Sequence, residues 1–202
     1  MNILKLIMLS AVIGSSLAAC NQNNNTSMAN QSDTASGINV VIDNMMTRRS
    51  IRKYTDRKVP HELLDTILDC GINAPNGRNQ QAYEVKVVTD SVSTAYLAEN
   101  VNGLYKAPVY IFIANQTDYD MSLIDVGLLS ENIGLSAWSY GIGSINLGSP
   151  VRAIKKNPEL LNKLGFSEGY DLCLALALGY PDETPDAKPR NKEKVQFIEI
   201  TK

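Results

Sequence analysis

The stretch from Ser122 to Tyr140 reads SLIDVGLLSENIGLSAWSY and is the most apolar long segment of the domain-forming sequence. Its only charged residues are Asp125 and Glu131. The bulky apolar side chains that recur along it are Ile124, Leu128, Ile133, Leu135 and Trp138. Glycine is a common residue just beyond a helix end, and Gly141 follows here. We therefore predict a central helix around which the rest of the fold is built.

The sequence on both sides of this helix alternates between helical and strand-like patterns. Short runs typical of strands occupy residues 83–89, 109–114, 171–178 and 195–200. Apolar spacing and helix-start residues predict further helices over residues 37–47 and 60–71 and from Pro150 onward. Because these elements do not follow a strict strand–helix–strand rhythm, we expect an α+β fold with a mixed central sheet surrounded by helices.

Composition limits the classes of function. The chain has 202 residues and is 44% apolar, with 19 basic and 21 acidic residues and a formal net charge of -2. This charge balance argues against a nucleic-acid-binding protein. Three cysteines and one histidine are too few for a disulfide-dense scaffold or a multi-histidine metal site. We therefore predict no metal site, and we expect His61 to be a surface residue.

The N-terminus has the pattern of an export signal. Lys5 precedes an apolar run over residues 6–17, which is shorter than the roughly 18–20 residues that span a bilayer. The run ends in Leu17-Ala18-Ala19-Cys20, which resembles the lipobox of bacterial lipoproteins, where the cysteine is acylated. A plain signal peptide that happens to meet a cysteine is the alternative. We predict a signal peptide over residues 1–19 and lipidation at Cys20.

The next segment is polar and low in complexity. Residues 21–37 are rich in Asn, Gln, Ser and Thr, which is typical of a flexible linker. We therefore predict that residues 20–37 tether one domain, residues 38–202, to a membrane. The protein is then expected in the cell envelope, lipid-anchored in the periplasm or at the outer membrane.

Two basic clusters stand out among residues that could carry chemistry. Arg48, Arg49 and Arg52 flank Ser50, and Lys188 and Arg190 lie far along the chain. Guanidinium groups and a hydroxyl suit a phosphate, although a solvated charge run is the alternative at each place. The sequence has no phosphate-binding loop and no Gly-x-Gly-x-x-Gly fingerprint.

A polar loop supplies a second kind of group. Residues 74–81 read APNGRNQQ, and their side-chain amides both donate and accept hydrogen bonds, as recognition of a flat heterocycle requires. An ordinary surface loop is the alternative. Cys70 and Cys173 are left either as buried free thiols or as a disulfide pair, and the sequence alone leaves both open.

Taken in order, these stretches resemble the nitroreductase family of flavoproteins. The family pattern Arg-Arg-Ser-x-Arg stands here at Arg48–Arg52, and its Pro- and Asn-containing loop corresponds to residues 74–83. Further matches are the helix from Asp125 to Gly141-Ile142-Gly143, the turn Asn146-Leu147-Gly148, the run Gly179-Tyr180-Pro181 and finally Lys188-Pro189-Arg190. The ordered set covers about residues 45–200, essentially the whole domain.

The resemblance implies FMN bound at the interface of a homodimer. By matching position, the phosphate and ribityl chain are expected to be held by Arg48, Ser50, Arg52, Lys188 and Arg190, with Arg49 lying against them. The flavin ring or its partner-chain contacts are expected to be lined by Pro75, Asn76, Gly77, Asn79 and Gln81. The backbone of Leu147 and Gly148 is expected to face the flavin N5 edge.

The chain departs from the family pattern at a few positions. Ala82 and Tyr83 stand where relatives have Pro and Trp, and Leu147 stands where many relatives have Glu. The segment over residues 89–108 is short, and the family often builds its substrate lid in such segments. We therefore expect a more open pocket, with the changes bearing on substrate more than on flavin binding.

The resemblance implies an FMN-dependent oxidoreductase that takes a hydride at flavin N5 and passes electrons to a nitroaromatic, quinone or similar small acceptor. The cofactor performs this chemistry, so no catalytic side chain is predicted. NAD(P)H is the usual family donor, but an exported protein would not normally meet it, so a membrane redox partner is another candidate. Alternatives are a membrane-tethered binding module without flavin, or a specialised flavin dehydrogenase or reductive dehalogenase.

Overall fold

The computed structural model describes residues 39–201, which lie within one compact unit, Ile38–Lys202. The predicted signal peptide, Cys20 and most of the tether fall outside the described residues. Across the part that is described, no helix is both long and apolar enough to cross a bilayer.

Helices and strands alternate along the described chain. The helices are α1 (Val40–Thr47), α2 (His61–Ile72), α3 (Ser91–Asn100), α4 (Ser122–Ser139), α5 (Ser149–Lys155) and α6 (Pro158–Leu164). The strands are β1 (Tyr83–Val88), β2 (Val109–Gln116), β3 (Gly143–Leu147) and β4 (Tyr170–Gly179). Two 3₁₀ turns, η1 (Gly77–Asn79) and η2 (Lys192–Lys194), complete the set.

The four strands form one sheet in the order β1-β2-β4-β3, and each neighbouring pair is antiparallel. Among residues 39–201, the parallel pairing is an isolated bridge between Ser50 and Ser144. The predicted α+β class is confirmed. The sheet expected to be mixed is antiparallel apart from that bridge.

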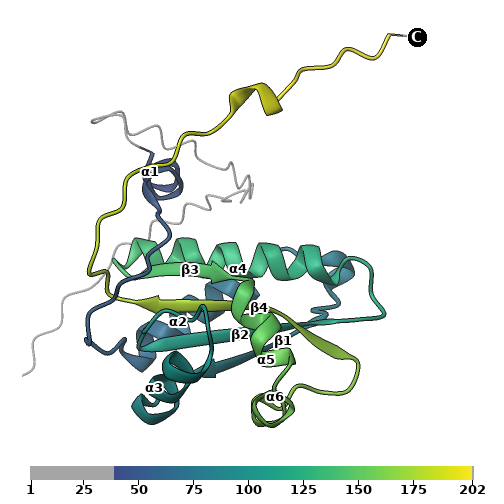
Figure 1. Ribbon diagram of the computed structural model, residues 1–202. Coiled ribbons are helices and arrows are strands. Elements are labelled where there is room, and N and C mark those ends of the chain that lie inside the picture. The colour runs from purple at the N-terminus through teal and green to yellow at the C-terminus, as the bar shows by residue number, and fades with distance from the viewer. Residues whose placement is uncertain (1–38, 202) are drawn as a thin grey trace, which may run out of the picture. The chain divides into compact units, whose positions relative to one another are not determined.

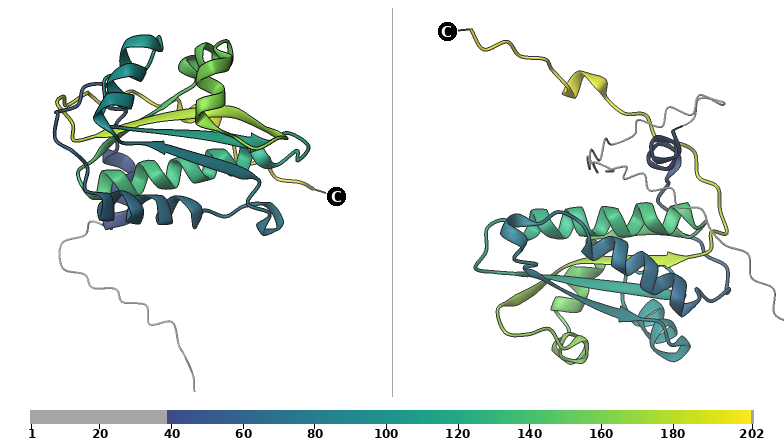
Figure 2. Two further views of the ribbon diagram at one scale, coloured as in Figure 1. Left: turned by 90° about the horizontal axis from the view of Figure 1, so that it is seen from below. Right: turned by 180° about the vertical axis from the view of Figure 1, so that it is seen from behind.

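Helices cover both faces of the sheet, with α2 and α4 on one face and α3, α5 and α6 on the other (Figures 1 and 2). The side chains of β2 show why. Tyr110 and Phe112 enter the core under α3, α5 and α6, whereas Ile111 and Ile113 enter the core under α2 and α4. Because alternate side chains of a strand face opposite ways, a strand that is apolar throughout must be covered on both sides.

The central helix lies where the sequence predicts it, as α4. Its buried apolar residues follow a spacing of three or four, at Val126, Leu129, Ile133 and Ala137. This spacing places them on one face, which packs against the sheet and α2. The chain leaves the helix at Gly141, whose φ of 71° is a conformation that favours glycine.

The secondary structure differs from the prediction in two ways. Residues 195–200 do not form a strand but lie in an exposed tail, where Phe197 is 101% exposed. Their alternating pattern finds no neighbouring strand within the described chain. The sequence analysis also missed β3, α3 and α6. In α3 only Thr94 and Leu97 are buried, so its sequence carries no clear apolar stripe.

The question left open for the two cysteines of the domain is settled by the fold. Cys70 is exposed on α2 and Cys173 is partly buried in β4, and both are free thiols. Burial raises the pKa of the Cys173 thiol to about 11, so this thiol stays protonated near neutral pH.

Candidate functional site

The segment Arg48–Arg52 is fixed at its buried residue, Ile51. Ile51 is 1% exposed, and its backbone N–H donates to the Ser144 carbonyl oxygen at 3.1 Å. A Cβ added at Gly143 would lie 2.5 Å from Ile51 Cγ1, so this close approach to β3 requires glycine. Since side chains alternate along an extended segment, burial of Ile51 turns Ser50 and Arg52 to the opposite side.

Arg48 lies along α4. A Cβ at Gly134 would lie 3.9 Å from Arg48 Cδ, so the aliphatic part of the side chain passes close to the helix. Arg48 Nε is 3.3 Å from Glu131 Oε1, but the geometry is not that of a hydrogen bond, and Nε is buried without a hydrogen-bond partner in the structure. The guanidinium therefore has donor capacity that the described residues leave unused.

The other two arginines of the motif have different surroundings. Arg49 Nη1 donates to the carbonyl oxygens of Met46 and Arg48, both at 2.8 Å, so it caps the C-terminal end of α1. Arg52 is exposed, and its Nη1 donates to the Ser50 carbonyl oxygen at 3.2 Å. Arg52 thus lies against the Ser50 backbone, Arg48 lies along α4, and Arg49 is turned toward α1.

The same segment holds the root of the C-terminal tail. Glu183 accepts hydrogen bonds from the backbone N–H groups of Arg52 and Lys53, and Asp182 N–H donates to the Lys53 carbonyl oxygen at 2.9 Å. Tyr54 Oη donates to the Ile51 carbonyl oxygen at 2.6 Å and lies 3.0 Å from that of Ala177. Burial, and then the nearby charge of Glu183, raises the pKa of Tyr54.

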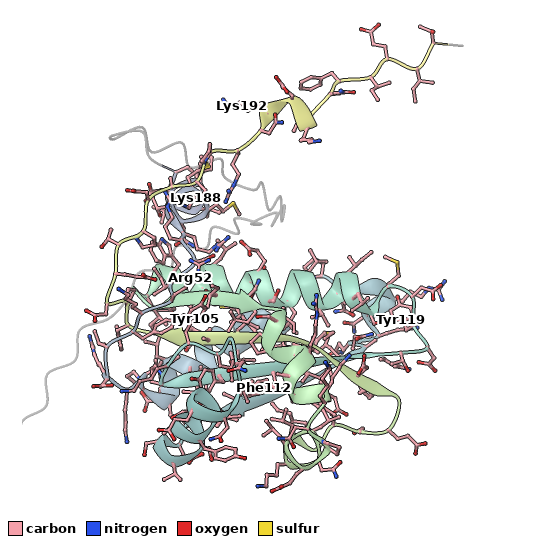
Figure 3. The ribbon with its side chains drawn as sticks, in the orientation of Figure 1. Arg52, Tyr105, Phe112, Tyr119, Lys188 and Lys192 are labelled. Atoms are coloured by element: carbon pink, nitrogen blue, oxygen red, sulfur yellow. The ribbon has the colours of Figure 1, made fainter. Side chains whose placement is uncertain are left out.

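Beyond this root the tail has no packing of its own. Residues 186–201 are all exposed. Over residues 39–201, neither Lys188 nor Arg190 makes a side-chain hydrogen bond or ion pair. Figure 3 shows Lys188 on the tail, above the sheet in that view. Within the described chain these two predicted site residues therefore make no hydrogen bond or ion pair with Arg48, Ser50 or Arg52.

The predicted polar loop is strained. Three of its non-glycine residues have positive φ angles: 54° at Arg78, 55° at Asn79 and 50° at Gln81. Such left-handed conformations cost about 1–2 kcal/mol per residue, least for asparagine. Asn76 Oδ1 accepts a hydrogen bond from Gln81 N–H at 3.0 Å, which closes the loop on itself, while Pro75 is exposed. Strain of this kind is typical of functional loops.

A buried carboxylate ties this loop to α4. Gly77 N–H donates to Asp125 Oδ1 at 3.0 Å, and Asp125 is only 2% exposed. Its Oδ2 is buried without a hydrogen-bond partner in the structure. Tyr119, labelled in Figure 3 near the start of α4, covers the other side, because a Cβ at Gly77 would lie 2.1 Å from its hydroxyl. Burial, and then the charge of Asp125, raises the pKa of Tyr83.

The end of β3 contributes mainly backbone. Leu147 is 6% exposed and packs into the core with α5, so its side chain is committed to the interior. Gly148, the next residue, is exposed. The predicted role of these two residues concerned their backbone, and the burial of the Leu147 side chain is compatible with it.

The parts of the site are arranged along α4 and β3. The loop joins the first turn of α4 at Asp125, Arg48 reaches α4 at Gly134, and Ser50 pairs with the start of β3. Nine residues of helix separate Asp125 from Gly134, a distance of about 14 Å. Such a strip suits an elongated ligand with an anionic end. No group of three potential metal ligands lies within the described part of the chain.

Sequence reasoning missed two residues that build this site. Asp125 was noted as a charge in the central helix but given no role, although an acidic residue in an apolar helix is a signal, because unpaired carboxylates are seldom buried. Glu183 had no signal. Its part depends on the tail turning back on Arg52, which no local pattern predicts.

Comparisons with known proteins identify relatives of this chain. The family model described as "Putative TM nitroreductase" matches residues 40–202. The "NADPH-flavin oxidoreductase" of Vibrio harveyi is 27% identical over 172 residues, covering 76% of this chain and 70% of the relative. The "FMN reductase [NAD(P)H]" of Bacillus subtilis is 29% identical over 175 residues, with 76% and 70% covered.

A solved structure gives the same result. A nitroreductase from Desulfitobacterium hafniense, crystallised with bound FMN, superposes with a TM-score of 0.69 at 28% identity, covering 81% of this chain and all of the other. The match of the family model over four fifths of the sequence, together with this similarity in fold, shows that the chain belongs to the nitroreductase family.

Proposed function

We propose that this chain is an FMN-dependent oxidoreductase that carries electrons from a reduced donor to a small acceptor, such as a nitroaromatic or a quinone. The observation that carries the proposal is the anchored cluster of Arg48, Ser50 and Arg52 beside α4. Burial of Ile51 and its hydrogen bond to β3 anchor the backbone that carries these side chains.

The donors of this cluster fit a phosphate. A phosphate monoester carries close to two negative charges and three acceptor oxygens at neutral pH. Arg48 and Arg52 supply forked cationic donors and Ser50 supplies a hydroxyl. The buried Nε of Arg48, which has no hydrogen bond, is the kind of unused donor that an incoming anion satisfies. Lys188 and Arg190 would add charge once the tail is ordered.

The remaining residues fit the ring end of the cofactor. FMN, when bound, supplies the redox chemistry through N5 of its ring. The side-chain amides of Asn76, Asn79 and Gln81 would orient the ring by hydrogen bonds, and the backbone at Leu147 and Gly148 would line its edge. Donors placed where negative charge accumulates on the ring favour its reduction.

We also propose a homodimer, on the strength of exposed apolar surface. Helix α1 has no buried residue, and its apolar side chains Val40, Ile42 and Met46 are 80%, 59% and 71% exposed. The exposed face of α4 adds Leu123 at 60% and Ile124 at 54%. Exposed apolar side chains gathered on these helices favour an interaction site. A second copy that covers α1 would also offer a surface for the apolar tail.

An absorbance spectrum tests the cofactor. The full chain, purified in detergent and mixed with FMN, is expected to retain flavin bands through gel filtration. Arg48→Ala and Arg52→Ala should each weaken FMN binding about 10–100-fold, as expected when a charge-assisted hydrogen bond is lost. Lys156→Ala, at an exposed residue directly after α5 on the opposite face of the sheet, is the matched control. A folded wild-type protein that retains no flavin would favour the flavin-free binding module.

Donor and acceptor are separated by anaerobic half-reactions. Bleaching of the flavin is measured with NADH, NADPH and a reduced quinone, each supplied alone. Reoxidation is then measured with a nitroaromatic, a quinone and a halogenated aromatic. Bleaching by the quinol but not by the nicotinamides would identify a membrane redox partner. Reoxidation by the halogenated compound alone would favour the reductive dehalogenase alternative.

The cell envelope is the proposed location, with the lipid attached at Cys20. The support is the order of Lys5, the apolar run and Leu17-Ala18-Ala19-Cys20. Mass spectrometry of the native N-terminal peptide should find acylated Cys20 as the first residue. Cys20→Ser should move the protein from the membrane to the soluble fraction. An unmodified N-terminus in the wild-type protein would overturn the lipoprotein assignment.

A further inference from the structure

Asp125 has an arrangement that packing alone does not explain. The carboxyl is 2% exposed and lies in the first turn of α4, yet it makes a single hydrogen bond, from Gly77 N–H to Oδ1 at 3.0 Å. The buried Oδ2 has no hydrogen-bond partner in the structure. Burying a carboxylate with so few donors is unfavourable, so its presence indicates a task other than stability.

The single hydrogen bond reaches a loop that needs external support. Arg78, Asn79 and Gln81 all have left-handed backbone conformations that non-glycine side chains rarely adopt. Gly77, directly before them, is held between Asp125 Oδ1 on its N–H and the hydroxyl of Tyr119 over its α-carbon. Gly77 is therefore the point at which the strained loop is attached to the helical core.

We propose that Asp125 is a positioning residue that fixes the loop Asn76–Gln81 through Gly77, and so holds the amide side chains of that loop ready for the cofactor. This inference rests on the proposed flavin site. Asp125 does not touch the predicted phosphate group, which lies about 14 Å further along α4. Its contribution is pre-organisation of the loop, which removes part of the ordering cost of binding.

Two substitutions at this position separate a hydrogen-bond tether from a charge. Asp125→Asn keeps Oδ1 as acceptor for Gly77 N–H and replaces the unpaired oxygen with an amide. Asp125→Ala removes the acceptor. We expect the Ala variant to bind FMN about 10-fold more weakly and the Asn variant to stay within about threefold of wild type. Asp69→Ala, an exposed acidic residue on α2, is the matched control.

Hydrogen exchange supplies a readout that does not depend on flavin. In Asp125→Ala, peptides covering residues 74–82 should exchange about tenfold faster, while peptides from β2 remain unchanged. Rescue of both exchange and FMN affinity by Asp125→Asn would support the tether. Unchanged loop exchange in a folded Ala variant would overturn it, as would an Asn variant that binds as weakly as the Ala variant.

The two proposals fail in different ways. If the wild-type protein binds no FMN, the flavin site is wrong, and the exchange experiment still decides whether Asp125 holds the loop. If the wild-type protein binds FMN and the Ala variant binds it equally well, the flavin site stands and the positioning role of Asp125 is overturned. A melting temperature for each variant shows whether the Ala substitution has unfolded the protein.

Discussion

The two basic clusters of the candidate phosphate site have opposite physical states. Arg48, Ser50 and Arg52 flank a residue that is 1% exposed and hydrogen-bonded to β3, so their backbone is fixed within one chain. Lys188 and Arg190 lie in a tail that is exposed from residue 186 onward. The first cluster is pre-organised, whereas the second needs a surface that residues 39–201 of a single chain do not provide.

From this contrast we propose that the site is assembled in two steps. Folding of one chain places the anchored cluster, the loop and β3. In this proposal the tail packs on a surface that residues 39–201 of one chain do not supply, and the apolar residues of the tail favour a protein surface. Val195, Phe197, Ile198 and Ile200 are each at least 72% exposed. Their burial in a second copy would bring Lys188 and Arg190 to a fixed position.

The largest loss of stability is expected at Ile51, the residue that anchors the segment Arg48–Arg52. Ile51→Ala removes a fully buried side chain at a close approach between backbones, and its unfolding free energy should fall by about 2–5 kcal/mol. Urea unfolding measures this loss, and FMN affinity should fall with it because the arginines lose their fixed backbone. Ile42→Ala on exposed α1 is the control and should change monomer stability little. An unchanged unfolding free energy in Ile51→Ala would show that the segment is not anchored.

Phe197 tests whether the C-terminal tail is buried between two copies. Phe197→Ser should leave the unfolding of the monomer unchanged, because the side chain is fully exposed within one chain. It should weaken dimerisation about 10–100-fold, as expected if a large apolar side chain becomes buried between copies. Sedimentation over a concentration series measures the shift. Equal dimerisation of wild type and variant would contradict the assembly in two steps.

The difference between the packed domain and the exposed tail also determines how much of the secondary structure can be predicted from the sequence. The central helix, the strands of residues 83–89, 109–114 and 171–178, and the α+β class follow from local apolar spacing. That spacing reports which side of an element is buried. Residues 195–200 carry the same strand-like alternation, but pairing is a tertiary event, and no partner strand exists within the described chain. Local pattern cannot distinguish these cases.

The candidate site divides in the same way. Arg48, Ser50 and Arg52 were identified from an ordered motif, and the structure shows the backbone between them anchored at Ile51. Asp125 and Glu183 were missed because their roles rest on contacts over 48 and 131 residues of sequence. The exposure of Lys188 was equally hidden, since a motif records the order of residues and not how each one packs.

The Tyr54 side chain links the anchored segment Arg48–Arg52 to β4. Tyr54→Phe removes a hydroxyl that contacts the carbonyl oxygens of Ile51 and Ala177, and should cost about 1–2 kcal/mol of unfolding free energy. Burial raises the pKa of Tyr54, so the folded state favours the neutral hydroxyl. This contribution is fully present below the ordinary tyrosine pKa of about 10 and declines as the pH rises above it. Urea unfolding at pH 8 and 10.5 should therefore show a smaller difference between wild type and Tyr54→Phe at the higher pH. A difference that grows with pH would contradict the assignment.

Glu183 joins the anchored segment to the tail, and two opposing effects meet there. Its carboxylate accepts from the backbone N–H groups of Arg52 and Lys53, which holds the tail root, but its charge also opposes an anion bound nearby. Glu183→Gln keeps an acceptor and removes the charge, so FMN should bind equally well or up to about threefold more tightly. Glu183→Ala loses both, and binding should weaken about threefold if placement of the tail root outweighs the charge.

Asp186→Ala, an exposed tail residue, is the control for a general loss of negative charge. Titration of all three variants with FMN decides which effect dominates. If Ala tightens binding as much as Gln does, the tail root needs no anchor and the two clusters act independently.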